Sequence, residues 1–187
     1  MISKNGLQSA VYERYVDGHV TEYAYVTAGT NDAADCVQDV AQVAGLSGQY
    51  SMSARNAKEI SHDIGRKTEL TYVGHSLGGG EAALNSMVTS GDGKGRKAVT
   101  FNAAGVGVLT MVANKARNTG GNVKAYVMIT DPLNMIQNGS SSLGRIMPDV
   151  NGKRIYLLPK DCGSVVNGHS INSVLRSFGV NPKKYAK

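Results

Sequence analysis

The stretch LTYVGHSLGGG at residues 70–80 decides the fold of this 187-residue chain. It opens with a short apolar run, which is typical of a buried strand in a parallel sheet. The motif GHSLG, residues 74–78, follows directly, and residues 81–89 then favour a helix. A G-x-S-x-G motif between a strand and a helix predicts a sharp turn that exposes the serine hydroxyl, because the two glycines leave room for neighbouring backbone.

Ser76 at this turn is predicted to be a catalytic nucleophile. The helix that follows directs its first N–H groups and its partial positive charge toward the serine. We therefore expect the Leu77 N–H to donate a hydrogen bond to the oxyanion that forms during attack. The alternative is a glycine-rich turn that binds a phosphate or no ligand, which the strand–turn–helix context disfavours.

A serine nucleophile needs a base, and His169 is the only histidine that follows Ser76 in the chain. In α/β-hydrolases the chain order is serine, then acid, then histidine. His169 lies in a loop before the last predicted helix, and the alternative is a surface or capping histidine. His75 is expected to point away from the nucleophile and to serve packing, while His19 and His62 are expected to be structural or surface residues.

Asp131 is the predicted acid that orients the base. It directly follows a buried-type strand and precedes Pro132, so it is expected at the carboxyl end of a strand, where α/β sites assemble. An Asp-Pro turn initiator is the alternative for this residue. Three other aspartates lie between the nucleophile and the base, in turn-like or loop-like stretches without a preceding strand: Asp92, Asp149 and Asp161.

Thr30 is the candidate for a second oxyanion donor. It lies in the polar loop that follows an earlier predicted strand, which is where this donor usually lies. Its backbone N–H and its hydroxyl are both available donors in such a loop. An ordinary polar loop is the competing interpretation.

The arrangement of strand and helix signals predicts an α/β fold. A hairpin is expected from residues 9–15 and 21–27, because Asp17-Gly18 between them is a strong turn signal. Further strands are expected at residues 70–73, 98–103, 123–129 and 155–158, and helices at 33–44, 53–64, 81–89, 109–116 and 171–178. The alternation indicates a mainly parallel central sheet flanked by helices, an α/β-hydrolase fold, in a single domain of residues 1–187.

Composition narrows the classes of partner. The net charge of +6 favours anionic partners, but the basic residues are dispersed and no basic run carries interleaved aromatics, so nucleic-acid binding is not expected. Cys36 and Cys162 form either one disulfide or two free thiols, and neither has the spacing of a metal site, so no metal or cofactor is expected. No signal peptide or membrane span is visible, which favours a cytosolic protein or one delivered within a larger polypeptide.

Residues 74–79, GHSLGG, resemble the elbow of the class 3, or fungal-type, lipases. Residues 25–30 resemble that family's oxyanion strand and loop, although Ala28 stands where its members usually have arginine. Residues 130–132 resemble its Asp-Pro acid loop, and residues 168–170 its late histidine. The resemblance implies hydrolysis of lipid esters at a membrane surface by a Ser-His-Asp triad, with phospholipids (A1-type cleavage) ahead of triacylglycerols. An acyltransferase and a catalytically inactive binding module are the alternatives.

The opening residues 6–12 and the compact size are also similar to lipase-like domains at the C-termini of bacterial polymorphic toxins. Such domains are delivered into rival cells and attack membrane phospholipids. This second resemblance implies an antibacterial effector and a cognate immunity protein as its partner.

Overall fold

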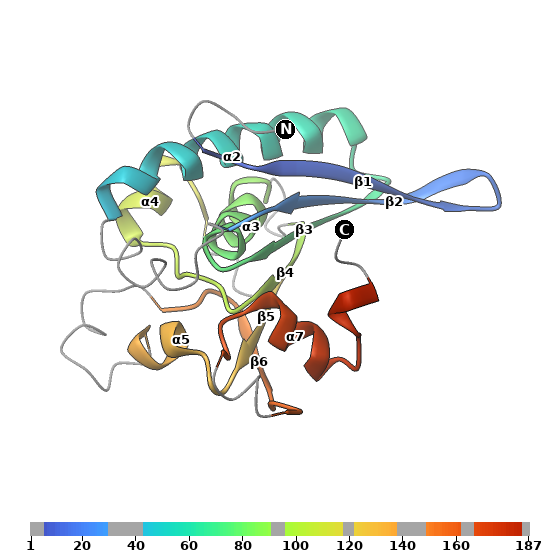
Figure 1. Ribbon diagram of the computed structural model, residues 1–187. Coiled ribbons are helices and arrows are strands. Elements are labelled where there is room, and N and C mark those ends of the chain that lie inside the picture. Colours follow the sequence, from blue (N-terminus) through green and yellow to red (C-terminus); the bar gives the residue numbers. More distant parts are fainter. Residues whose placement is uncertain are drawn as a thin grey trace.

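The computed structural model describes residues 6–29, 43–90, 96–117, 122–137, 149–161 and 167–184 (Figure 1). Its strands are β1 (Ser9–Val16), β2 (His19–Thr27), β3 (Glu69–His75), β4 (Lys97–Phe101), β5 (Val123–Met128) and β6 (Lys153–Leu157). Its helices are α2 (Val43–Ile64), α3 (Leu77–Val88), α4 (Val108–Ala113), α5 (Pro132–Gln137) and α7 (Ile171–Ser177), followed by the 3₁₀ turn η1 (Pro182–Lys184).

The six strands form one sheet in the order β1-β2-β3-β4-β5-β6. Strands β1 and β2 pair antiparallel, and every following neighbour pairs parallel. The predicted α/β architecture, with a mainly parallel sheet and an N-terminal hairpin, is therefore confirmed. Because β2 to β6 run in one direction, their carboxyl ends share one edge of the sheet. Figure 1 shows α4 and α5 on the left, where β4 and β5 end, and the hairpin tip on the right.

The hairpin turn forms at the predicted dipeptide. Asp17 and Gly18 have φ angles of 50° and 78°, so both adopt the left-handed conformation of a two-residue turn whose twist matches its strands. The strands extend slightly closer to the turn than the sequence predicts.

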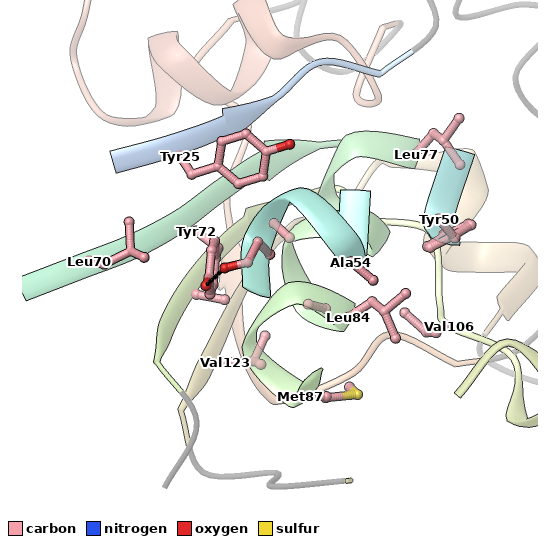
Figure 2. Close-up of a cluster of buried hydrophobic side chains, with 14 residues drawn as sticks. Tyr25, Tyr50, Ala54, Leu70, Tyr72, Leu77, Leu84, Met87, Val106 and Val123 are labelled. Carbon is pink, nitrogen blue, oxygen red and sulfur yellow. Dashed lines mark hydrogen bonds between the residues drawn. The ribbon is translucent and has the colours of Figure 1, made fainter. Parts of the chain in front are cut away.

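Helices α2 and α3 cover one face of the sheet. Consecutive parallel strands joined by right-handed crossovers place their connecting helices on the same face, which explains this layer. Figure 2 shows the hydrophobic core that the sheet forms with these two helices. In this core the rings of Tyr25 and Tyr72 meet edge to face, and the Tyr72 hydroxyl donates a hydrogen bond of 3.3 Å to the Ala57 carbonyl. The other large side chains of this core include Leu70, Leu84, Met87 and Val123.

Helix α7 lies against the opposite face. Phe178, directly after the helix, contacts the rings of Phe101 and Tyr126 on β4 and β5, with centroid distances of 6.2 and 5.4 Å. These contacts fix the position of α7 on the sheet. The loop at its N-terminus, which carries His169, is thereby held near the carboxyl ends of the strands.

Two helices begin well before their predicted starts. Helix α2 begins at Val43 rather than Ser53, and α3 begins at Leu77 rather than Glu81. After Leu77, the first turn of α3 continues with Gly78, Gly79 and Gly80, which have low helix propensity and hide the helix start in the sequence. Helix α5 was not predicted. Most of the predicted helix at residues 33–44 lies outside the described residues, as do Thr30, Cys36, Asp92 and Cys162.

Candidate active site

Ser76 stands alone between strand β3 and helix α3. Its φ and ψ angles are 56° and −125°, a conformation that costs on the order of 1–3 kcal/mol for a residue with a Cβ. The surrounding backbone holds it there: the Ser76 N–H donates to the Phe101 carbonyl, and its own carbonyl accepts from the Ala104 N–H, each at 3.0 Å. The turn is thus fixed by the end of the neighbouring strand β4.

The glycines of the motif are required by close packing. A Cβ on Gly74 would collide with the carbonyl of Gly78, and a Cβ on Gly78 would collide with the backbone of Thr27. The Thr27 hydroxyl donates a hydrogen bond of 2.7 Å to the Gly78 carbonyl. The first turn of α3 is therefore locked against the end of β2, and larger residues at the two glycine positions would push the elbow open.

Three of the side chains singled out in the sequence lie in one hydrogen-bonded chain. His169 Nε2 lies 2.9 Å from Ser76 Oγ, and His169 Nδ1 lies 2.8 Å from Asp131 Oδ1. All three residues are buried, with exposed fractions of 1% for Ser76, 5% for His169 and 1% for Asp131. Such a chain positions an imidazole to remove a proton from a serine hydroxyl.

Asp131 also caps helix α5. Its Oδ1 accepts a hydrogen bond of 3.1 Å from the Leu133 N–H, and its Oδ2 accepts one of 3.3 Å from the Asn134 N–H. Pro132 occupies the first helical position, where its missing N–H costs nothing. The carboxylate that faces His169 is consequently fixed in orientation by the helix it begins.

The other candidate acids lie in different surroundings. Asp149 forms an ion pair with Arg154, and Asp161 forms one of 3.6 Å with Arg176. Their side chains are substantially exposed, in contrast to the buried Asp131. His19 and His62 are likewise exposed, and His62 lies beside Asp63 at the end of α2.

His75 forms a specific hydrogen bond in addition to the packing role that the sequence predicts. Its side chain lies on the opposite side of β3 from the α2–α3 core, and its Nε2 lies 2.7 Å from the backbone carbonyl of His169. Since a carbonyl only accepts, the proton must be on His75 Nε2. Burial lowers the pKa of His75 to about 4, so the ring is neutral at physiological pH.

Asn102 is a site residue that the sequence reasoning missed. It follows strand β4 with a φ angle of 43°, a left-handed conformation that asparagine tolerates. Its Nδ2 donates to the carbonyls of Gly168 and His169 at 2.9 and 3.1 Å, and its Oδ1 accepts from the Met128 N–H at 2.8 Å. The sequence shows only an asparagine near the end of the predicted strand at residues 98–103, and its burial and its partners come from the structure.

The first turn of α3 places a backbone N–H next to Ser76. The Leu77 N–H is the first of the helix, so it has no carbonyl one turn earlier to receive its hydrogen bond. The loop after β2 approaches the same place, because a Cβ on Gly29 would lie 3.1 Å from the Ser76 Cβ. The predicted second donor, Thr30, is the next residue and lies outside the described part of the chain.

A cavity of about 420 Å³ borders His169. Its walls come from the ends of β2 and β3, from β4 and from the start of α7, and they are mainly apolar. Val26, Val73, Phe101 and Ile171 contribute the larger side chains. Its volume lies in the range of small-molecule sites, about 300–1,000 Å³.

The described residues contain no candidate metal site and no candidate membrane-spanning helix. Within those ranges, no three His, Cys, Asp or Glu side chains are grouped to bind a metal ion. No helix there is both long and apolar enough to cross a bilayer.

Comparison with known proteins identifies the family. Residues 1–170 match the family model described as a Tle-like phospholipase domain. The chain belongs to this family. The matched range of the phospholipase-like domain includes Ser76, Asp131 and His169.

One relative of this phospholipase-like domain is an extracellular phospholipase A1 of Serratia liquefaciens, which is 33% identical to it over 165 residues. The alignment covers 84% of the chain and 47% of the relative. The chain therefore spans about half the length of this curated relative.

Proposed function

We propose that the chain is a phospholipase A1-type carboxylic ester hydrolase whose triad consists of Ser76, His169 and Asp131. The observation that carries the proposal is the continuous hydrogen-bonded chain from Ser76 Oγ through His169 to Asp131, placed on a strained strand-to-helix turn. A buried serine with these two partners has the geometry of an activated nucleophile.

In the proposed reaction, Ser76 Oγ attacks the ester carbonyl carbon while His169 Nε2 takes the hydroxyl proton. Asp131 holds the proton on His169 Nδ1, so that Nε2 is free to act as the base. The Leu77 N–H stabilises the oxyanion, and we assign Thr30 as the second donor. Collapse breaks the bond to the leaving alcohol, which receives its proton from His169 and departs as a lysophospholipid. Water, activated by His169, then attacks the acyl-enzyme and releases the fatty acid.

Two observations support a phospholipid substrate. The matched family is a phospholipase family, and the relative with 33% identity is named a phospholipase A1. The mainly apolar cavity beside His169 suits an acyl chain. We therefore propose the sn-1 acyl ester as the scissile bond.

We further propose that the domain acts as an antibacterial effector, delivered within a larger polypeptide and neutralised by a cognate immunity protein. The similarity of residues 6–12 and of the compact size to lipase-like toxin domains supports this role. The net charge of +6 suits attack on anionic membranes.

The test is fatty-acid release from vesicles of phosphatidylglycerol and phosphatidylethanolamine and from triacylglycerol emulsions, for the wild type and for Ser76→Ala. We expect release from the phospholipids, and a loss of several orders of magnitude in the variant. Preferred release from triacylglycerol would make the chain a triacylglycerol lipase. Acyl transfer to an added alcohol in preference to water would make it an acyltransferase. Equal release by both proteins, or none, would exclude the proposal.

A further inference from the structure

Helix α4 exposes apolar side chains that a helix of a globular protein normally buries. Val108, Leu109 and Val112 have exposed fractions of 69%, 86% and 70%, and none of the six residues of α4 is buried. A soluble domain gains nothing from such exposure, because burying apolar area is the main stabilising term in folding. Contiguous exposed apolar groups of this kind mark a surface that binds a partner.

The position of α4 relates this surface to the active site. The segment between β4 and α4 contacts the elbow, since the Ala104 N–H donates to the Ser76 carbonyl. Helix α5, which begins directly after Asp131, presents Met135 with an exposed fraction of 63%. Both helices follow the carboxyl ends of parallel strands, and Figure 1 shows them at the same end of the molecule.

Cations accompany these apolar groups. Lys115 and Arg117 directly follow α4 and are exposed, and the Lys58 ammonium of α2 donates a hydrogen bond of 3.4 Å to the Asn114 carbonyl in the same turn. Residues 103–117 contain no aspartate or glutamate. An apolar helix face bordered by cations is the composition that binds at the boundary between acyl chains and anionic headgroups.

We propose that this surface docks the domain onto anionic phospholipid membranes, with the carboxyl edge of the sheet facing the lipid. The surface consists of Val108, Leu109, Val112, Lys115 and Arg117, and is named the α4 surface below. The proposal rests on the proposed function, because docking at this edge brings the membrane to the side of the molecule that carries Ser76. Charge complementarity favours a lipid surface over an apolar protein partner.

The first test measures vesicle binding by flotation, using Ser76→Ala protein so that the lipids stay intact. Vesicles of phosphatidylglycerol mixed with phosphatidylcholine are compared with phosphatidylcholine alone. We expect binding to the anionic vesicles, and a loss of about tenfold or more in partitioning when Leu109→Ser and Val112→Ser are combined. The matched control is Tyr15→Ser with Val16→Ser, which removes exposed apolar side chains from the hairpin at the opposite end and is expected to bind normally.

The second test removes charge from the same surface. Lys115 has a φ angle of 55°, so Lys115→Asn keeps a residue that tolerates this backbone, and it is combined with Arg117→Gln. We expect anionic vesicle binding to fall by about fivefold per cation, with no change on neutral vesicles. Lys183→Gln with Lys184→Gln at η1 is the control for net charge and is expected to have a smaller effect.

Hydrolysis of a water-soluble short-chain ester, p-nitrophenyl butyrate, separates the two proposals. With Ser76 intact, all surface variants are expected to keep the wild-type rate on this ester while hydrolysis of anionic vesicles falls. Equal vesicle binding by the α4 variants and the hairpin control would overturn the proposal that the α4 surface docks on membranes. The proposed esterase activity would be unaffected by that result. Loss of ester hydrolysis in the α4 variants would show that the helix is structural, which also overturns docking. Failure of the unmodified protein to hydrolyse any ester would instead count against the proposed function.

Discussion

His75 Nε2 lies 2.7 Å from the backbone carbonyl of His169. The residue before the proposed nucleophile is thus bonded to the main chain of the proposed base, although the two are 94 positions apart in the sequence. The rings of the two histidines also lie close, with centroids 5.1 Å apart. Movement of the His169 loop away from the elbow must therefore break a partly buried hydrogen bond.

Substitutions of His75 can distinguish its hydrogen bond to the His169 loop from the packing of its ring. His75→Phe keeps a planar ring but removes the N–H, so the His169 loop loses one of its anchors. We expect kcat on a soluble ester to fall by about 10- to 100-fold with little change in KM, because a small displacement of a catalytic group costs rate rather than binding. His75→Gln, which retains a side-chain N–H donor, is expected to keep most of the activity. Equal activities in the two variants would show that only the volume of residue 75 matters.

Asn102 is expected to act as the second anchor of the same loop. Asn102→Gly keeps the left-handed backbone but deletes the amide, leaving the Gly168 carbonyl and the Met128 N–H without this buried partner. We expect a loss of about 1–3 kcal/mol in the free energy of unfolding, together with a lower kcat.

Asn102→Asp is the sharper comparison at this position. It turns a donor into a carboxylate that faces two carbonyl oxygens, so it is expected to be less active than the glycine variant. Steady-state kinetics and urea unfolding on the same samples measure both effects. Full activity in Asn102→Asp would contradict the anchoring role.

Asp131→Asn is expected to lower the catalytic rate without unfolding helix α5. Asparagine caps helices as well as aspartate does, so α5 should remain formed and the melting temperature should change little. The amide no longer holds the proton on His169 Nδ1, and kcat is expected to fall by about 10³- to 10⁴-fold. Asp161→Asn, in the exposed pair with Arg176, is the control and is expected to have wild-type activity. A variant of Asp131 that keeps even a tenth of the activity would argue for a different acid.

Glu81 makes stability depend on pH. Burial raises the pKa of Glu81 from 4.5 to about 8, and neither carboxyl oxygen has a hydrogen-bond partner among the described residues. The folded chain therefore keeps a proton that the unfolded chain releases, so the free energy of unfolding should fall as pH rises from about 4.5 to about 8.

The side-chain amide of Glu81→Gln does not titrate, so this variant lacks the carboxyl proton that Glu81 keeps in the folded chain. Its stability advantage over the wild type is expected to grow by about 1.4 kcal/mol per pH unit within that window. Urea unfolding of both proteins at several pH values measures the difference, and Glu59→Gln on the exposed side of α2 is the control. Parallel stability curves for the wild type and Glu81→Gln would refute the prediction.

The elbow and the sheet were predictable because their constraints are local. Gly74 and Gly78 must be small where backbone passes within contact distance, and this requirement appears in the sequence as a fixed spacing around Ser76. The Asp17-Gly18 turn likewise needs two left-handed residues in succession. Asp131 was separable from the other aspartates because it alone directly follows a strand.

The remaining features depend on contacts between distant segments. Asn102 is one of several asparagines in the sequence, and its role follows only from the meeting of β4, β5 and the His169 loop. Helix α3 begins earlier than predicted because tertiary packing overrides the low helix propensity of its glycines. The exposure of Leu109 on α4 is equally invisible in sequence, where an apolar helix residue indicates a core position.

The most direct test of the central claim is to trap the acyl-enzyme. A phospholipid with different acyl chains at sn-1 and sn-2 is mixed with stoichiometric protein and quenched in acid within the first turnover, and the digested protein is weighed by mass spectrometry. We expect the peptide containing Ser76 to gain the mass of the sn-1 acyl group, and the Ser76→Ala protein to gain nothing. An acyl group on another residue, the sn-2 chain on Ser76, or turnover without any acylated peptide would contradict it.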